Sequence, residues 1–178
     1  MAAPNVTLRP YRPEDADALY AAARESISDV FPWLPWCHPA YSIEEAREWS
    51  SSRAEQARRG VEYVFVIAGE GDRFLGGCGI NQINRIHGFA NLGYWVRSAE
   101  AGRGVAPAAV AHAAHLAFTS TDLVRLEIVC AVGNTRSQRV AEKAGAVREG
   151  VLRDRLVLHG TAHDAVMYSL VKSRWAAR

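Results

Sequence analysis

The chain has 178 residues, of which 49% are hydrophobic and 22% charged, and its formal net charge is +2. Because domains average roughly 150 residues, this length predicts a single domain over residues 1–178 with one substantial core. The apolar fraction and the lack of internal repeats exclude a disordered chain, collagen and a coiled coil. A near-neutral charge also argues against nucleic-acid binding, which usually requires a basic face.

The cysteines and the hydropathy pattern indicate the cellular compartment. Cys37, Cys78 and Cys130 are far apart and odd in number, which favours free thiols in a reducing compartment over a disulfide framework. Residues 1–13 contain no apolar run of signal-peptide length. The longest apolar stretch, residues 105–118, is too short to span a bilayer. We therefore expect a soluble, cytoplasmic protein that does not bind membranes.

The first third of the chain is expected to contain one strand and two helices. Apolar and polar residues alternate over Val6–Arg9, as in a half-buried strand. A helix should follow, because a proline, three acidic residues and an apolar stripe come next. Three prolines then interrupt residues 32–39 and leave an aromatic loop. Ser42 and Glu45 have the spacing of a capping box, which begins a second helix that runs to about Arg59.

The rest of the chain consists of strands and helices without a linker-like stretch. Three strands separated by turn signals should form an antiparallel meander, followed by helix, strand, helix and two strands. The expected strands are Tyr63–Ala68, Phe74–Ile83, Ala90–Arg97, Arg125–Val132, Val147–Leu158 and Ala165–Val171, and the expected helices are Gly104–Thr119 and Thr135–Ala144.

Two glycines stand directly before the predicted helix at residue 105. Gly102 and Gly104 allow a ligand to approach the backbone closely, and the helix start offers unpaired N–H groups and partial positive charge. Arg103 adds a permanently charged bidentate donor, so a phosphate or pyrophosphate is the expected guest. The simpler interpretation is a turn without a ligand. A Rossmann motif is disfavoured, because the glycines follow antiparallel strands and G-x-G-x-x-G is incomplete.

A second polar segment follows the strand that ends near residue 132. Asn134 can cap the next helix through its side-chain oxygen, and Ser137 lies in the first turn of that helix. Each also has a plain alternative, a structural cap for Asn134 and an exposed helix position for Ser137. Their place beside the glycine loop would instead bring an amide and a hydroxyl into one cleft.

Several spaced motifs agree with one another. They are Leu92-Gly93-Tyr94-Trp95-Val96, Gly102-Arg103-Gly104-Val105-Ala106, Arg125-Leu126-Glu127, Asn134-Thr135-Arg136-Ser137, Val140-Ala141-Glu142-Lys143 and Glu149-Gly150. Together they resemble the GNAT superfamily of N-acetyltransferases, and within it the RimJ/RimL-like branch of ribosomal-protein N-terminal acetyltransferases. The resemblance spans nearly the whole chain. It implies an α/β fold with a mixed, mostly antiparallel, twisted sheet of about seven strands flanked by about four helices.

The resemblance implies acetyl-CoA as the acetyl donor, bound in a gap between the fourth and fifth strands. In the family, the glycine turn binds the pyrophosphate of CoA and the exposed backbone of the preceding strand binds pantetheine. The pyrophosphate role falls on Gly102, Arg103, Gly104, Val105 and Ala106, and the pantetheine role on Trp95, Val96 and Arg97.

Other roles follow from the same resemblance. Asn134 would contact the pantetheine arm, and Lys143 would reach the nucleotide phosphates. Ser137 would act catalytically as the partner of the departing thiolate, and the Val96 N–H would stabilise the developing oxyanion. Trp33 and Trp36 are assigned to acceptor binding, because their proline-rich loop borders the acceptor pocket in the family. The alternative for both tryptophans is cover of the core.

The sequence departs from the family pattern at three positions. Ala101 stands where the glycine motif usually opens with Gln or Arg, which removes a side chain but keeps the backbone donors. Asn91 and Leu156 stand where relatives carry the usual general-base carboxylates. The base stays open, and bulk water could serve an N-terminal amine, whose pKa is about 8. The candidate side chains are His38, His87, Glu100, Asp154 and Asp164.

The function favoured by the sequence is transfer of acetyl from acetyl-CoA to a primary amine, by direct attack of the amine on the thioester. The favoured acceptor is a protein N-terminal α-amine, such as that of a ribosomal protein. A small amine (aminoglycoside, polyamine or amino-acid derivative) is the alternative, and a non-catalytic CoA-binding module is the third. No metal is expected, because His112 and His115 lack a third ligand. The sequence is also compatible with a homodimer.

Overall fold

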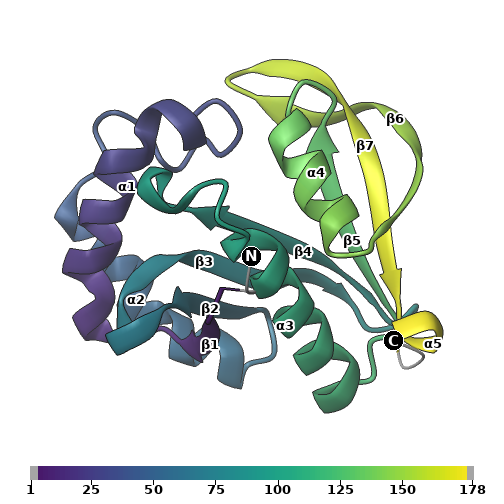
Figure 1. Cartoon of the computed structure of the whole chain (residues 1–178), viewed down its shortest axis with the longest axis horizontal. Coiled ribbons are helices and arrows are strands. Elements are labelled where there is room, and N and C mark those ends of the chain that lie inside the picture. Colours follow the sequence, from purple (N-terminus) through teal and green to yellow (C-terminus); the bar gives the residue numbers. More distant parts are fainter. Residues whose placement is uncertain (1–3, 176–178) are drawn as a thin grey trace.

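A twisted sheet forms the centre of the computed structural model, which describes residues 4–175 (Figure 1). Within these residues the sheet has seven strands in the order β1-β2-β3-β4-β5-β7-β6. Neighbouring strands are antiparallel, except that β4 and β5 run parallel. The strands are β1 (Thr7–Pro10), β2 (Tyr63–Ala68), β3 (Phe74–Asn84), β4 (Phe89–Val96), β5 (Arg125–Ala131), β6 (Val147–Leu158) and β7 (Thr161–Val171).

Helices cover both faces of the sheet. Successive residues of β2 point to opposite faces, so Val66 packs with the cluster of α1 and α2, whereas Ile67 packs with the cluster of α3 and α4. The helices in the described residues are α1 (Ala16–Val30), α2 (Ile43–Arg58), α3 (Val105–Ser120), α4 (Thr135–Lys143) and the single turn α5 (Lys172–Trp175).

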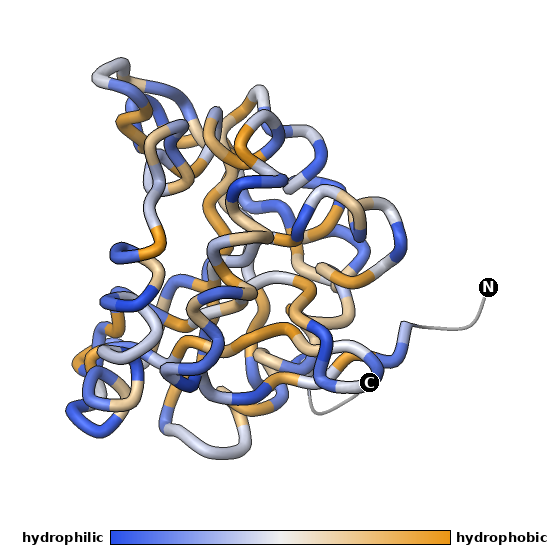
Figure 2. The backbone as a smooth tube through the Cα atoms, turned by 90° about the vertical axis from the view of Figure 1, so that its left-hand side faces the viewer, coloured by the Kyte–Doolittle hydropathy of each residue, from blue (hydrophilic) through white to orange (hydrophobic). Residues whose placement is uncertain are grey.

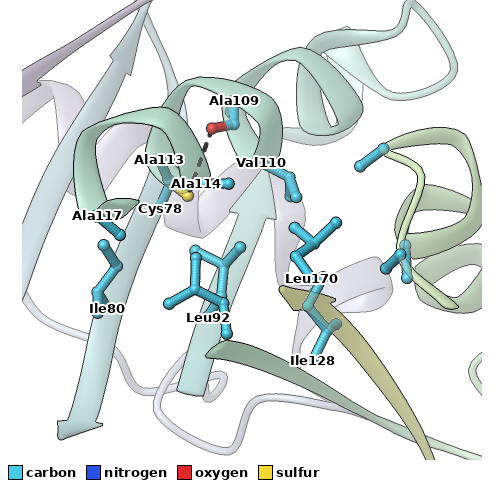
Figure 3. Packing of buried hydrophobic residues seen from close by; sticks show 14 of the residues in the cluster. Cys78, Ile80, Leu92, Ala109, Val110, Ala113, Ala114, Ala117, Ile128 and Leu170 are labelled. Atoms are coloured by element: carbon cyan, nitrogen blue, oxygen red, sulfur yellow. Dashed lines mark hydrogen bonds between the residues drawn. The ribbon is translucent and has the colours of Figure 1, made fainter. Parts of the chain in front are cut away.

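Small residues bring α3 close to the sheet. Ala109, Ala113 and Ala117 lie four residues apart and are fully buried, so one face of α3 is a stripe of alanines. Figure 3 shows this stripe over Cys78 and Ile80 of β3, with a weak hydrogen bond from the Cys78 thiol to the Ala109 carbonyl. In Figure 2 hydrophobic stretches run mainly through the interior, and hydrophilic residues dominate the outer turns. The close contact holds α3 against β3 and β4.

The parallel strands β4 and β5 separate along their length. They pair only from Phe89 to Asn91 on β4 and from Arg125 to Glu127 on β5. Beyond these residues β4 continues to Val96 beside β3, while β5 continues to Ala131 beside β7. The ends of the two strands therefore stand apart, and Figure 1 shows them diverging. This is the gap between the fourth and fifth strands that the family resemblance implies.

The structure confirms most predicted elements and corrects two. The capping box of Ser42 and Glu45 begins α2, and the predicted fold class is confirmed. The last strand begins at Thr161 rather than Ala165, because the turn at His159-Gly160 is tight and pairing resumes at once. The predicted "about four helices" omits α5, which is only one turn long. None of the described helices is long and apolar enough to cross a membrane.

Candidate functional site

The opening between β4 and β5 is a cleft with a volume of about 640 Å³. Its walls come from β4, the loop before α3, the end of β5 and one side of α4. The last turn of α1 and the far half of β6 close its remaining side. The cleft therefore joins elements from both halves of the sheet.

The loop before α3 presents free backbone donors to the cleft. Gly102 and Gly104 have φ angles of 78° and 80°, a left-handed conformation that favours glycine. Val105 and Ala106 line the cleft in the first turn of α3. Their N–H groups precede the first helical hydrogen bond, which Ala108 N donates to Gly104 O at 3.2 Å. The loop thus has the donors and the open backbone that an anion requires.

Ion pairs and hydrogen bonds hold this loop in place. Glu100 is 6% exposed and accepts a hydrogen bond from Arg73, at the start of β3. The Arg103 guanidinium lies 3.9 Å from Glu100 and is mostly exposed. Glu25 of α1 accepts from Arg97 and, at 2.9 Å, from the N–H of Ala99. These contacts hold the pKa of Glu25 below its ordinary value and fix the loop to α1.

One face of α4 carries cations into the cleft. Arg136, Arg139, Val140 and Lys143 all line the cleft, at the three- and four-residue spacing of a helix face. Arg139 and Lys143 have no ion-pair or hydrogen-bond partner among the described residues. These two side chains are free to meet anionic groups, and the sequence reasoning missed Arg139.

The backbone at the end of β4 also faces the opening. Arg97 N donates to Leu75 O of β3 at 2.9 Å. Successive N–H groups of a strand point to opposite edges, so the Val96 N–H points away from β3. Val96 lines the cleft at the point where β5 no longer pairs with β4. This N–H is therefore a donor directed at the gap.

The Ser137 hydroxyl lies between two side chains of the cleft. Its Oγ is 3.0 Å from the Tyr94 hydroxyl and 3.2 Å from Cys130 Sγ. The Tyr94 hydroxyl also donates to the Ser137 carbonyl at 2.9 Å. Burial raises the pKa of Tyr94, so the phenol keeps its proton and remains a donor. Burial likewise raises the pKa of Cys130, which disfavours a reactive thiolate there.

Asn134 caps α4. Its Oδ1 accepts a hydrogen bond from Ser137 N at 3.1 Å, which confirms the predicted cap. The cap occupies the side-chain oxygen and leaves the amide Nδ2 as the free donor. Asn134 also lines the cleft, so the cap and a ligand contact are compatible.

Asp29 connects the two sides of the opening. Its Oδ2 accepts from Ser98 Oγ at 2.5 Å, just after β4, and its Oδ1 accepts from Arg136 at 2.8 Å, in the first turn of α4. These partners hold the pKa of Asp29 below its ordinary value. The three residues form the Asp29 bridge, which no sequence motif announces.

A second contact closes the cleft beside the Asp29 bridge. His159 lies at the tip of the β6–β7 hairpin. Its Nε2 is 2.9 Å from the Phe31 carbonyl oxygen, and the centroids of the His159 and Phe31 rings are 4.4 Å apart. Figure 1 shows the hairpin arching over α4 toward the end of α1. The loop after α1 also touches the chain just after β5, because a Cβ added to Gly133 would lie 3.3 Å from the Trp33 ring. We call this edge of the cleft the hairpin rim.

The sequence and the fold match known acetyltransferases. Residues 5–147 match the acetyltransferase (GNAT) domain family. YdaF of Bacillus subtilis, a proposed ribosomal N-acetyltransferase, is 30% identical over 176 residues, which cover 96% of this chain and 93% of that protein. The chain belongs to the GNAT acetyltransferase family. The family resemblance drawn from the sequence motifs is thereby confirmed.

Two further relatives agree with this assignment. The ribosomal-protein-serine acetyltransferase of Escherichia coli is 28% identical over 138 residues, which cover 78% of this chain and 76% of that protein. The structure of Mycobacterium smegmatis RimJ in complex with CoA-disulfide has a TM-score of 0.87 and 29% identity, and covers 95% of this chain and 83% of that chain. The GNAT domain and these relatives identify the protein as an acyltransferase.

The cleft of this GNAT protein gathers most of the residues predicted for the site. The predicted residues that line it are Trp33, Trp95, Val96, Gly102, Gly104, Val105, Ala106, Asn134, Ser137 and Lys143. Three predicted residues lie outside the lining. Arg97 is engaged by Glu25, Arg103 extends toward solvent, and Trp36 packs edge-on against Trp95 with ring centroids 5.2 Å apart.

The candidate bases are mostly remote from the cleft. Of the five, only Glu100 lines it, and Glu100 is bound by Arg73. His38 pairs with Glu45, and His87 lies in the turn between β3 and β4. Asp154 lies on β6, where its backbone N–H donates to Asp164 Oδ1 of β7. Among the residues described, no group of three or more His, Cys, Asp or Glu could hold a metal ion.

Proposed function

We propose that this protein transfers an acetyl group from acetyl-CoA to the α-amine of a protein N-terminus. The observation that carries the proposal is the opening between β4 and β5, whose lining contains the free amides at the start of α3, Val96 with its free N–H, and Ser137.

The residues of the cleft fit CoA. Pyrophosphate suits the amides of Val105 and Ala106 at the start of α3, where a Cβ on Gly102 would meet nothing within 4 Å. Arg139 and Lys143 supply unpaired positive charge on the facing helix. Pantetheine suits the edge of β4 that no strand covers beyond Asn91. All of these groups lie along one continuous cleft.

The chemistry that acetyl-CoA supplies when bound is an activated thioester, whose thiol has a pKa of about 8.5. The Val96 N–H stabilises negative charge that develops on the carbonyl oxygen during attack. Ser137 donates its proton to a hydrogen bond with the leaving sulfur, and Tyr94 holds the Ser137 carbonyl and hydroxyl in position.

The lack of a free base among the described residues of the cleft favours an α-amine as substrate. Among the described residues that line the cleft, only Asp29 and Glu100 carry carboxylates, and both are bound by arginines. We propose that no side chain takes the amine proton and that water removes it before attack. An α-amine with a pKa of about 8 is partly neutral at pH 7, whereas a lysine-like amine with a pKa of about 10.4 is almost fully charged.

The names of the relatives support the same acceptor. YdaF and the Escherichia coli enzyme are both named for ribosomal substrates. We therefore propose a ribosomal protein as the class of acceptor, and the cytoplasm as the place where the two meet. Acetylation of a small amine and CoA binding without catalysis remain as the competing functions.

An acetyl-transfer assay separates these functions. Thiol release from acetyl-CoA is measured with hexapeptides that carry a free N-terminus, with the same peptides blocked at the N-terminus but containing lysine, and with spermidine or an aminoglycoside. We expect turnover of the free peptides only, with kcat/KM rising up to about pH 8 as the α-amine loses its proton. Turnover of the small amines alone would contradict the proposal, and tight CoA binding without turnover would favour the non-catalytic module.

The homodimer is a separate proposal. Strand β6 is an edge of the sheet, and Val147, Val151 and Val157 on it are 52%, 46% and 68% exposed. We propose that a second copy of the chain pairs with this edge, because a long exposed edge strand readily pairs with another chain. Sedimentation equilibrium should give twice the chain mass, and a Val157→Lys variant should give one chain mass.

A further inference from the structure

An irregularity in β6 directs a charged residue into the cleft. Leu152 pairs with Ala165 and Leu156 with His163, so three residues of β6 stand opposite Asp164 alone. Asp154 has a φ of 49°, and its N–H donates to Asp164 Oδ1 at 3.0 Å. A bulge of this kind reorients the side chains that follow it. Here Arg155 and Leu156 become part of the cleft lining, whereas Arg153 does not.

The Arg155 guanidinium is an unpaired charge at the hairpin rim. Arg155 is exposed and has no hydrogen-bond or ion-pair partner in the part of the chain that the structure describes. Arg136, by contrast, is neutralised by Asp29. Arg155 lies on the strand that leads to His159, and His159 contacts Phe31 at the end of α1. The hairpin rim also includes Trp33, Leu156 and Leu158, whose side chains are largely apolar.

Arg155 comes from a different element of the cleft than the phosphate donors. The amides of α3 and the side chains of Arg139 and Lys143 already provide for the anionic groups of CoA. Arg155 comes instead from β6, beside Leu156 and Leu158 and next to the end of α1. An anion opposite Arg155 is therefore expected from the acceptor.

We propose that Arg155 binds a carboxylate of the acceptor, so that the enzyme prefers N-termini with Asp or Glu at the second or third residue. This inference rests on the proposed transfer to protein N-termini and names the acceptor class more narrowly. A guanidinium forms charge-assisted, often bidentate hydrogen bonds with a carboxylate. At a partly exposed rim, such a contact should change kcat/KM by about tenfold.

The test compares matched peptides. Hexapeptides with Asp, Asn or Lys at the second residue, and the same set at the third, are assayed with acetyl-CoA for kcat/KM. The wild-type enzyme should prefer the Asp peptide over the Asn peptide by about tenfold at low salt, and the preference should shrink at high salt. Arg155→Gln should bring the Asp to Asn ratio near one, and Arg155→Glu should favour the Lys peptide.

Arg153→Gln is the control, because Arg153 lies in the same bulge but outside the cleft. It should keep the wild-type ratio. Equal turnover of Asp, Asn and Lys peptides by the wild-type enzyme would overturn the inference while leaving the proposed function intact. A large rise in the Kd of CoA for Arg155→Gln, measured by calorimetry, would also overturn it, because Arg155 would then bind the cofactor. Transfer to none of the peptides would overturn both proposals.

Discussion

Ser137 is the central residue of the proposed chemistry. It has contacts with Tyr94 and Cys130, and its backbone N–H is bound by the Asn134 side chain. Three neighbours thus determine where one hydroxyl points. The sequence motif identifies Asn134 and Ser137 three residues apart, but it does not show that Tyr94, more than forty residues earlier in the chain, holds the same hydroxyl.

Removing this hydroxyl should slow transfer without weakening cofactor binding. Ser137→Ala is expected to lower kcat by roughly 10²-fold, the usual scale for a lost proton donor in the transition state. The Kd of CoA should change little, because the hydroxyl meets only the sulfur. Stopped-flow thiol release and calorimetry measure the two quantities. Cys130→Ala, which removes the other neighbour of the hydroxyl, should retain most of the turnover, and wild-type kcat in Ser137→Ala would refute the assignment.

At the scale of elements, the site depends on how two strands separate and two helices begin. The loop before α3 supplies amides, and α4 supplies Ser137 in its first turn and cations along one face. The glycine loop and the N-cap of α4 were predictable, because glycine and asparagine have local conformational preferences that a sequence reveals. The Asp29 bridge was not, because it joins side chains far apart in the chain.

The left-handed turn before α3 should be sensitive to a branched side chain. Gly104→Val places a β-branched residue at a φ of 80°, which costs about 1–3 kcal/mol and displaces the amides of α3. The Kd of CoA should rise by tenfold or more. Gly71→Val is the matched control, because Gly71 has a φ of 67° and open space around it but lies outside the cleft. Unchanged affinity in Gly104→Val would reject the phosphate placement.

The Asp29 bridge should hold the two sides of the opening together. Asp29→Ala removes the acceptor of both Ser98 and Arg136, so the loop before α3 and the first turn of α4 should exchange amide hydrogens faster. Hydrogen exchange followed by mass spectrometry measures the exchange rate of these two segments directly. The kcat/KM for acetyl transfer should also fall. Asp17→Asn, on the exposed side of α1, serves as the control. Unchanged exchange in both segments would show that the bridge does not constrain the opening.

At the scale of the whole molecule, some family motifs stabilise the sheet instead of serving the reaction. Arg125 bonds to Glu127 at 2.8 Å and to Glu149 at 2.5 Å, and Glu149 accepts from Ser169 at 2.6 Å. These residues join β5, β6 and β7 at a distance from the cleft lining. The sequence motifs alone therefore did not show which of their residues form a structural network and which form a binding site.

This network should make the fold sensitive to acid. Arg125 and the Ser169 hydroxyl lower the pKa of Glu149 to about 2, from an unfolded value of about 4.5. Between these pH values the unfolded chain binds a proton that the folded chain does not, so stability falls as pH falls from about 5 to 2. Urea unfolding of Glu149→Gln across this range should show a smaller loss than wild type. An identical loss would contradict the role of Glu149, and Glu48→Gln should behave as wild type.

The sequence predicted the order of elements better than it predicted their irregularities. Strand alternation, glycine turns and capping residues are local signals, and they located all the strands and the four longer helices. The bulge at Asp154 and the early start of β7 at Thr161 depend on pairing between strands, which composition does not reveal. Arg155 was missed for this reason, because its direction follows from the bulge.

The most direct test of the account is a crystal structure of the protein with CoA and an N-terminal acceptor peptide. We expect the pyrophosphate on the amides of Val105 and Ala106, the sulfur beside Ser137, and the peptide amine entering past Trp33 at the hairpin rim. The account would be contradicted by a cofactor bound outside the opening between β4 and β5, or by a sulfur remote from the Ser137 hydroxyl.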